Sequence, residues 1–204
     1  MHELQAAIGA GLIDLAFIHE MWLYVPDCDC PPPLREVANL YDLRLKVGKD
    51  TPLGIGSKLN YNSQSGKFAQ TVGENPPYLN WIYASIITAG CRTQILDAIG
   101  THPMGARAAL MIATDAVLFL TEHPDLPISN QLGDWSHKVK RNVTLAKPGF
   151  WWDQSARDAL VEGKAPSVKS RGISAAAFAR TMGVVDEQFN GWLAWSEFRW
   201  YGLA

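Results

Sequence analysis

Apolar and polar residues follow one another in blocks along this 204-residue chain, and proline and glycine separate the blocks. The first block, residues 2–25, opens with an alanine-rich helix pattern and continues into IDLAFIHEMWLYV, which is rich in strand formers. The second block runs as a helix from Leu34 to about Leu45, breaks at GKDTPLGIG, and resumes as a helix near Ser57. This pattern predicts a helical hairpin.

A third block follows the NPP sequence at residues 75–77 and predicts one long helix that runs to Gly100. Asn75 is the expected cap of this helix, and the prolines suit its first turn. The residues from Ser174 onward receive no assignment from their pattern.

The stretch ALMIATDAVLFL, residues 109–120, is apolar except at Thr114 and Asp115. It predicts two short strands that meet at a turn. A carboxylate in apolar surroundings is costly without a compensating partner, so Asp115 is a candidate ligand for a hard cation such as Mg²⁺. The alternative is an Asp that closes the turn by bonding its own backbone.

Composition describes a globular chain, with 48% hydrophobic residues to build a core. No apolar run approaches the roughly 20 residues that a membrane-spanning helix needs, and the first residues lack a signal-peptide pattern. We therefore expect a cytoplasmic protein with no membrane contact. Cys28, Cys30 and Cys91 are too few for a disulfide framework and are expected to be reduced.

The net charge of -2 conceals a basic region at residues 135–171, which carries eight Lys or Arg against three acids. Such a region is either a footprint for phosphates or an ordinary solvated surface. Within it, Lys147 precedes paired aromatic residues, and Lys169 and Arg171 follow. Lysines beside aromatics suit a nucleic-acid backbone, and the competing interpretation is an aromatic core strand with a charged edge.

Two predicted helices carry further candidates. In SKLNYNSQSGKF, helical spacing places a cation, an amide, a hydroxyl and a bare backbone patch on one face. These groups belong to Lys58, Asn62, Ser65 and Gly66, and they suit an anionic or flat ligand. In SIITAGCR, the hydroxyls of Ser85 and Thr88 form a row that ends in Arg92, and this row is a candidate phosphodiester contact. Solvated or plainly amphipathic helix faces have the same pattern.

The order of these motifs resembles the C-terminal polymerase portion of B-family DNA polymerases of phages and related elements, over about residues 3–175. The family's fingers motif is Lys, three residues, Asn-Ser, one residue, Tyr-Gly. Ser65 replaces the tyrosine here, and the remaining motif positions match: Lys58, Asn62, Ser63 and Gly66. The resemblance implies that Lys58 contacts the nucleotide triphosphate and that Asn62 lies near the base pair. Looser phosphate candidates precede the fingers turn: Arg44, Lys46 and Lys49.

The family's palm-helix motif is Thr, two residues, Gly-Arg. Thr88 and Arg92 match it as template and primer contacts, whereas Cys91 replaces the glycine. The family's Asp-Thr-Asp-Ser hairpin is ATDA here, so Asp115 keeps the metal-binding position and Ala113 replaces the first Asp. The resemblance implies that three basic residues lie at the junction of palm and thumb, where the DNA is gripped: Lys147, Lys169 and Arg171.

The resemblance implies an α+β fold with an antiparallel palm sheet, a helical fingers hairpin and a partial thumb. The expected parts are palm at 1–33, fingers at 34–76, palm with the metal hairpin at 77–145, and palm–thumb junction with partial thumb at 146–204. The implied activity is template-directed DNA synthesis, with Mg²⁺ as cofactor and with primer-template DNA and dNTP as partners.

The family's second metal-binding Asp belongs to a Ser-Leu-Tyr-Pro motif upstream of the fingers, and no such motif precedes Lys58. Because two-metal catalysis needs carboxylates from two places, we expect this chain to be inactive alone and to need an N-terminal polymerase or exonuclease polypeptide. The alternatives are a degenerate relative that binds nucleic acid or a partner without catalysis, and a chain that folds only with its other half and is poorly soluble alone.

Overall fold

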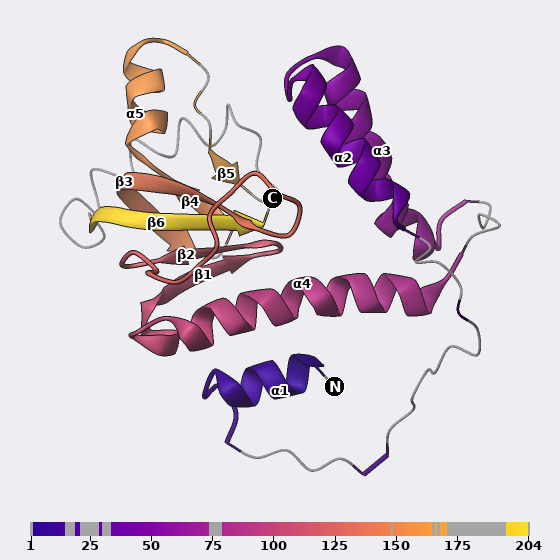
Figure 1. Ribbon diagram of the computed structural model, residues 1–204. Helices are drawn as coiled ribbons and strands as arrows, with labels where there is room; N and C mark the ends of the chain where they lie inside the picture. The colour runs from indigo at the N-terminus through magenta and orange to yellow at the C-terminus, as the bar shows by residue number, and fades with distance from the viewer. Residues whose placement is uncertain are drawn as a thin grey trace.

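The chain, shown as a computed structural model in Figure 1, combines helices with one antiparallel sheet. The structure describes residues 2–14, 19–20, 29, 34–73, 79–147, 149–164, 166, 168–170 and 195–203. Within these residues there are five α-helices and six strands. The α+β class and the antiparallel sheet are confirmed, whereas the division into palm, fingers and thumb remains a prediction.

Two antiparallel helices, α2 (Glu36–Val47) and α3 (Pro52–Phe68), form the expected hairpin. The prediction that the second helix starts near Ser57 is wrong, because the stretch PLGIG is already helical. The side chain of Thr51 caps α3 by accepting a hydrogen bond from the Gly54 N–H at 3.1 Å, and a proline occupies the first turn. This cap outweighs the low helix propensity of the glycines that follow.

Gly54 is required by the tight connection between the two helices. A Cβ atom at this position would lie 2.0 Å from the carbonyl oxygen of Gly48, which is a backbone atom and cannot rotate away. The glycine that we expected to interrupt the helix instead lets the two arms of the hairpin approach each other.

Helix α4 (Trp81–Thr101) is the longest element and runs beneath both the α2–α3 hairpin and the sheet (Figure 1). Its cap is Asn80, whose side chain accepts a hydrogen bond from the Tyr83 N–H at 3.1 Å, so the prediction of Asn75 as the cap is wrong. The short helix α1 (His2–Gly9) lies along α4 and was expected from the sequence. The strand expected after it falls largely outside the described residues.

The sheet has the strand order β1-β2-β6-β3-β4-β5, and each neighbouring pair is antiparallel. A strand from the last part of the chain, β6, therefore lies between β2 and β3. The assignment of residues 146–204 to a palm–thumb junction and partial thumb remains a prediction. The strands are β1 (Ala109–Ala113), β2 (Ala116–Phe119), β3 (Trp135–Lys147), β4 (Phe150–Trp152), β5 (Lys169–Ser170) and β6 (Trp195–Leu203).

Both faces of the sheet are covered by apolar packing. On one face, α4 packs its last turns against β2 and β6 in a buried cluster that includes Ile95, Ile99, Val117, Phe119 and Tyr201. On the other face, a second cluster is formed by Met111, Leu118, Val143 and Trp151. Burying a large apolar side chain contributes about 1.5–3 kcal/mol, so these clusters make the sheet the most firmly packed part of the molecule.

The remaining helix, α5 (Gln154–Val161), packs against β3 and β4. Its first turn is capped by the side chain of Asp153, which accepts a hydrogen bond from the Ala156 N–H at 3.3 Å. None of the helices in the described part of the chain is long and apolar enough to cross a bilayer.

Candidate functional site

Asp115 lies in the two-residue turn that joins β1 to β2, as the sequence predicted. Ala113 and Ala116 pair across this hairpin, the Asp115 N–H donates to the Ala113 carbonyl at 2.7 Å, and Thr114 has a left-handed backbone with φ of 55°. The Leu203 N–H of β6 donates to the Asp115 carbonyl at 2.9 Å. Backbone hydrogen bonds therefore close and anchor the turn, and the Asp115 side chain is exposed to solvent.

Helix α4 contacts this turn directly through Cys91, whose thiol donates a hydrogen bond to the Thr114 carbonyl at 3.5 Å. Burial raises the pKa of the Cys91 thiol, the negative charge of Asp115 raises it further, and the nearby Arg92 lowers it. The net increase in the pKa keeps the thiol protonated, which it must be to donate. The residue that departs from the family's palm-helix motif thus ties that helix to the carboxylate-bearing turn.

Thr88 and Arg92 both lie on the exposed surface of α4, one turn apart. The Thr88 hydroxyl donates to the Ala84 carbonyl at 2.7 Å, and the Arg92 guanidinium forms an ion pair with Glu3 of α1. This ion pair is more than one-third exposed on each side, so it contributes little to stability and a phosphate can compete for the arginine.

The candidates on α3 share one exposed face of the helix: Lys58, Asn62, Ser65 and Gly66. The Ser65 hydroxyl donates to the Asn62 carbonyl at 3.1 Å. Gly66 has no other heavy atom within 4 Å of the place where a side chain would begin. The bare patch expected at this glycine is therefore open, and a ligand can approach the backbone there.

Asn62 and Ser65 also line a pocket of about 400 Å³ at the junction of α2, α3 and α4. Its apolar wall comes from the first turns of α2, from Ile87 of α4 and from Leu132 in the loop after β2. A mostly apolar cavity with a few amide and hydroxyl groups is typical of a site for a small organic ligand. The structure thus brings two of the predicted nucleotide-binding residues to a single cavity.

Arg44 lies on α2 and its guanidinium donates a hydrogen bond to the Tyr61 hydroxyl of α3 at 3.3 Å. This bond joins the two helices of the hairpin. The sequence predicts that Arg44 contacts phosphate. The guanidinium has five N–H donors, so it can bind a phosphate and the Tyr61 hydroxyl at the same time.

The basic candidates near the end of the chain are only partly described. Lys147 ends β3, and Lys169 begins β5 and pairs with Trp151 of β4, but their side chains and the whole of Arg171 lie outside the described residues. The aromatic residues of β4 are at most 8% exposed, which favours the alternative of an aromatic core strand: Phe150, Trp151 and Trp152.

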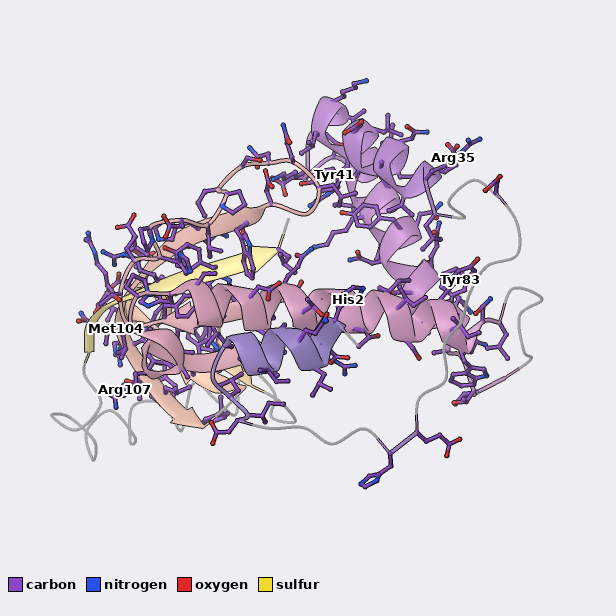
Figure 2. All side chains as sticks on the ribbon, turned by 60° about the horizontal axis from the view of Figure 1, so that its bottom comes forward. His2, Arg35, Tyr41, Tyr83, Met104 and Arg107 are labelled. Atoms are coloured by element: carbon purple, nitrogen blue, oxygen red, sulfur yellow. The ribbon has the colours of Figure 1, made fainter. Side chains whose placement is uncertain are left out.

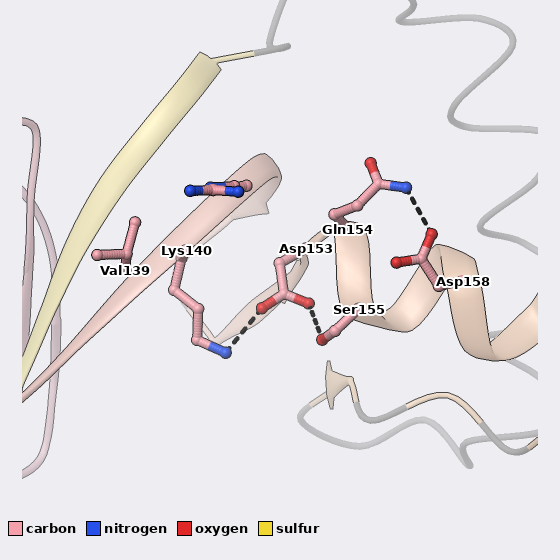
Figure 3. A pocket seen from close by; sticks show the side chains of 7 residues that line it. Val139, Lys140, Asp153, Gln154, Ser155 and Asp158 are labelled. Carbon is pink, nitrogen blue, oxygen red and sulfur yellow. Dashed lines mark hydrogen bonds and ion pairs between the residues drawn. The ribbon is translucent and has the colours of Figure 1, made fainter.

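Several charges of the basic region are paired within the protein. The Lys140 ammonium lies 2.7 Å from a carboxylate oxygen of Asp153, beside a pocket of about 440 Å³ (Figure 3). Burial alone would raise the pKa of Asp153, but hydrogen bonds from Lys140 and Ser155 lower it below its ordinary value overall. Lys164 also pairs with Glu162 at 2.7 Å. The region therefore offers fewer unpaired positive charges to a phosphate than its sequence indicates.

The described residues do not by themselves fit a two-metal magnesium site. Asp115 supplies one carboxylate, and the strand beside it, β6, brings Gly202 and Leu203 rather than a second acid to this end of the sheet. No cluster of three or more His, Cys, Asp or Glu side chains in the described ranges is positioned to hold a metal ion. A complete site would need ligands from other residues or from another chain.

Three residues at the pocket and its surroundings were missed by the sequence analysis: Tyr41, Asn130 and Leu132. Tyr41 lies in a predicted helix with no distinguishing motif, and the other two lie in a loop whose position depends on distant contacts. The only signal for Tyr41 is a large aromatic residue among the leucines of a helix pattern.

Comparison with known proteins supports a polymerase relationship. The chain is 36% identical over 98 residues to a DNA polymerase of Acidianus bottle-shaped virus (isolate Italy/Pozzuoli). The matched segment covers 48% of this chain and 14% of that polymerase, so this chain corresponds to a small part of the length of its relative. No protein-family model and no solved structure matches the chain. The chain is thus similar to a viral DNA polymerase over about half of its own length.

Proposed function

We propose that this chain is the C-terminal part or a subunit of a B-family DNA polymerase and takes part in template-directed DNA synthesis. The observation that carries the proposal is the hairpin turn that presents Asp115 in solvent while α4, with Thr88 and Arg92, is hydrogen-bonded to the same turn. The similarity to a viral DNA polymerase supports the role in DNA synthesis.

In the proposed reaction, the 3′ hydroxyl of a primer attacks the α-phosphate of a dNTP, and pyrophosphate leaves. Lys58 neutralises charge on the triphosphate, and Asn62, with Ser65 and Gly66, positions the base and sugar. Thr88 and Arg92 bind the primer-template backbone, with Lys147, Lys169 and Arg171 beyond it. Asp115 provides one ligand for Mg²⁺, and an N-terminal polypeptide provides the missing acid.

The test is primer extension by the chain with and without an N-terminal polypeptide that carries the missing acid. We expect no extension by the chain alone and extension by the mixture. Robust extension by the isolated chain would contradict the claim that an essential acid comes from elsewhere. In the mixture, Asp115→Asn is expected to reduce synthesis by about 100-fold or more, because a fixed carboxylate charge is lost. Asp97→Asn, which changes an exposed acid on α4, is the matched control.

A second candidate function is binding of nucleic acid or a partner protein without catalysis. It is favoured by the strand next to Asp115, where Gly202 and Leu203 lie in place of a second acid. If Asp115→Asn changes neither synthesis nor DNA binding by the mixture, while the basic residues are needed for binding, this second function replaces the first.

A further inference from the structure

The loop at residues 121–134, between β2 and β3, is fixed to the sheet at both ends. Near its start, the His123 N–H donates to the Tyr201 hydroxyl of β6 at 2.8 Å, and the His123 ring bonds the Ala98 carbonyl of α4 at 3.0 Å. Near its end, the Trp135 N–H donates to the Pro127 carbonyl at 2.9 Å. Buried partners at both ends hold a connection that contains neither helix nor strand.

The middle of this loop contacts the α2–α3 hairpin. The Tyr41 hydroxyl of α2 donates to the Asn130 carbonyl at 2.9 Å, and the Lys49 ammonium lies 3.2 Å from the Asn130 side-chain oxygen. Tyr41 is 3% exposed and lies on the side of the hairpin that faces the loop (Figure 2). Burial raises the pKa of Tyr41, with a smaller increase from Tyr61, so the hydroxyl stays protonated as a donor.

The same loop also lines the pocket that contains Asn62 and Ser65. Leu132, two residues after the contact with α2, lines this pocket together with Ile87 of α4. One short segment therefore contacts both the hairpin and the pocket, and it adds to the packing of α3 on α4 through Phe68 and Tyr83.

We propose that residues 121–134 are a strap that holds the α2–α3 hairpin beside the sheet, and that Leu132 is the strap residue that limits the size of the nucleobase admitted beside Asn62. The identity of the ligand rests on the proposed function; the holding role does not.

The holding role is tested by hydrogen exchange of the full chain carrying Tyr41→Phe together with Lys49→Met. Removing both donors is expected to speed exchange of amides in 36–47 and 128–134 about tenfold and to leave 109–119 unchanged. Tyr83→Phe, on α4, is the matched control. Exchange in 36–47 and 128–134 equal to that of the control would overturn the strap. Asn130→Ala, which keeps the backbone acceptor, is expected to give a smaller increase.

The selective role is tested with two probes, dATP and N6-benzyl-dATP, in equilibrium dialysis. Leu132→Ala is expected to bind the benzylated nucleotide about tenfold more tightly than the unaltered chain does, with dATP binding changed less than about threefold. Leu59→Ala, at an exposed leucine of α3, is the control. If Leu132→Ala behaves like this control, the selective role fails while nucleotide binding stands.

The two experiments separate the strap from the proposed function. A chain that binds neither nucleotide, with or without its N-terminal polypeptide, contradicts both the proposed function and the selective role of Leu132. Faster exchange in the Tyr41→Phe and Lys49→Met variant would still establish that the strap holds the hairpin.

Discussion

In β2, three consecutive side chains, Val117, Leu118 and Phe119, are completely buried, whereas the 17 residues of α3 bury only Gly54 and Ser57. Asp115 therefore lies in a turn next to a strand that is packed on both faces, whereas the candidates of α3 lie on a helix with little core of its own. The two halves of the candidate site therefore differ in how firmly they are held. The turn that carries the carboxylate is anchored to a buried strand, whereas α3 is held mainly by its contacts with the neighbouring helices α2 and α4.

The difference in packing between β2 and α3 is tested most directly by removing one large side chain from each element. Phe119→Ala is expected to lower the free energy of unfolding by about 3–5 kcal/mol, because it leaves a cavity among Tyr201, His102 and His123. Leu59→Ala, at a residue 66% exposed, is expected to change it by less than about 0.5 kcal/mol. Urea titration followed by circular dichroism measures both, and equal losses would contradict the contrast.

The next largest effect is expected at Asp153, on the side of the sheet away from α4. Asp153→Ala removes both the cap of α5 and the partner of the half-buried Lys140, at a cost of about 2–4 kcal/mol. Asp153→Asn keeps the cap and is expected to cost less. Because the folded pKa is lowered, this contribution is present above the ordinary pKa of 3.8 and is lost as the pH falls through the lowered value.

A pH dependence near neutrality is expected from His123. Burial lowers its pKa from 6.5, the Ala98 carbonyl raises it, His102 lowers it and Asp125 raises it, with a net decrease. Below about pH 6.5 the unfolded chain then binds more protons than the folded chain. The free energy of unfolding therefore decreases as the pH is lowered, by at most about 1.4 kcal/mol per pH unit for one group. Melting temperatures between pH 5 and pH 8 measure this, and His123→Gln is expected to flatten the profile.

The smallest expected effect concerns the hydrogen bond between Cys91 of α4 and the turn at Thr114. Cys91→Ala removes the thiol donor to Thr114, and we expect amide exchange at Asp115 to become about two- to threefold faster, because thiol hydrogen bonds are weak. Cys91→Ser provides a hydroxyl donor and is expected to restore the slower exchange. Identical exchange in the alanine and serine variants would show that the thiol does not hold the turn.

Local patterns sufficed to predict the hairpin at 109–120 and the existence of α2, α3 and α4. Each has a signal within a few residues, such as the polar pair Thr114-Asp115 between two apolar runs. The pattern places the start of α3 too late because glycine disfavours a helix, whereas Thr51 provides a cap and Gly54 permits a close approach to Gly48. Caps and close approaches depend on geometry that a propensity pattern does not contain.

The arrangement around the candidate site could not be predicted in the same way. β6 pairs with β2 and β3, which are distant in sequence, and nothing in residues 195–203 specifies those partners. The contact between Tyr41 and Asn130 likewise joins residues that only the fold brings together. The proposed roles of Lys58, Lys147 and Lys169 rest on motif resemblance and remain predictions.

The place of β6 has a consequence for how the molecule is made. Since β2 and β3 each pair with β6 and not with each other, the growing chain on a ribosome carries two open strand edges until residues 195–203 emerge. The central ladder therefore closes only after residues 195–203 have been synthesised, and loop-closure entropy slows that step. A nascent chain stopped before Trp195 would be a target for chaperones, because its unpaired edges invite association with other chains.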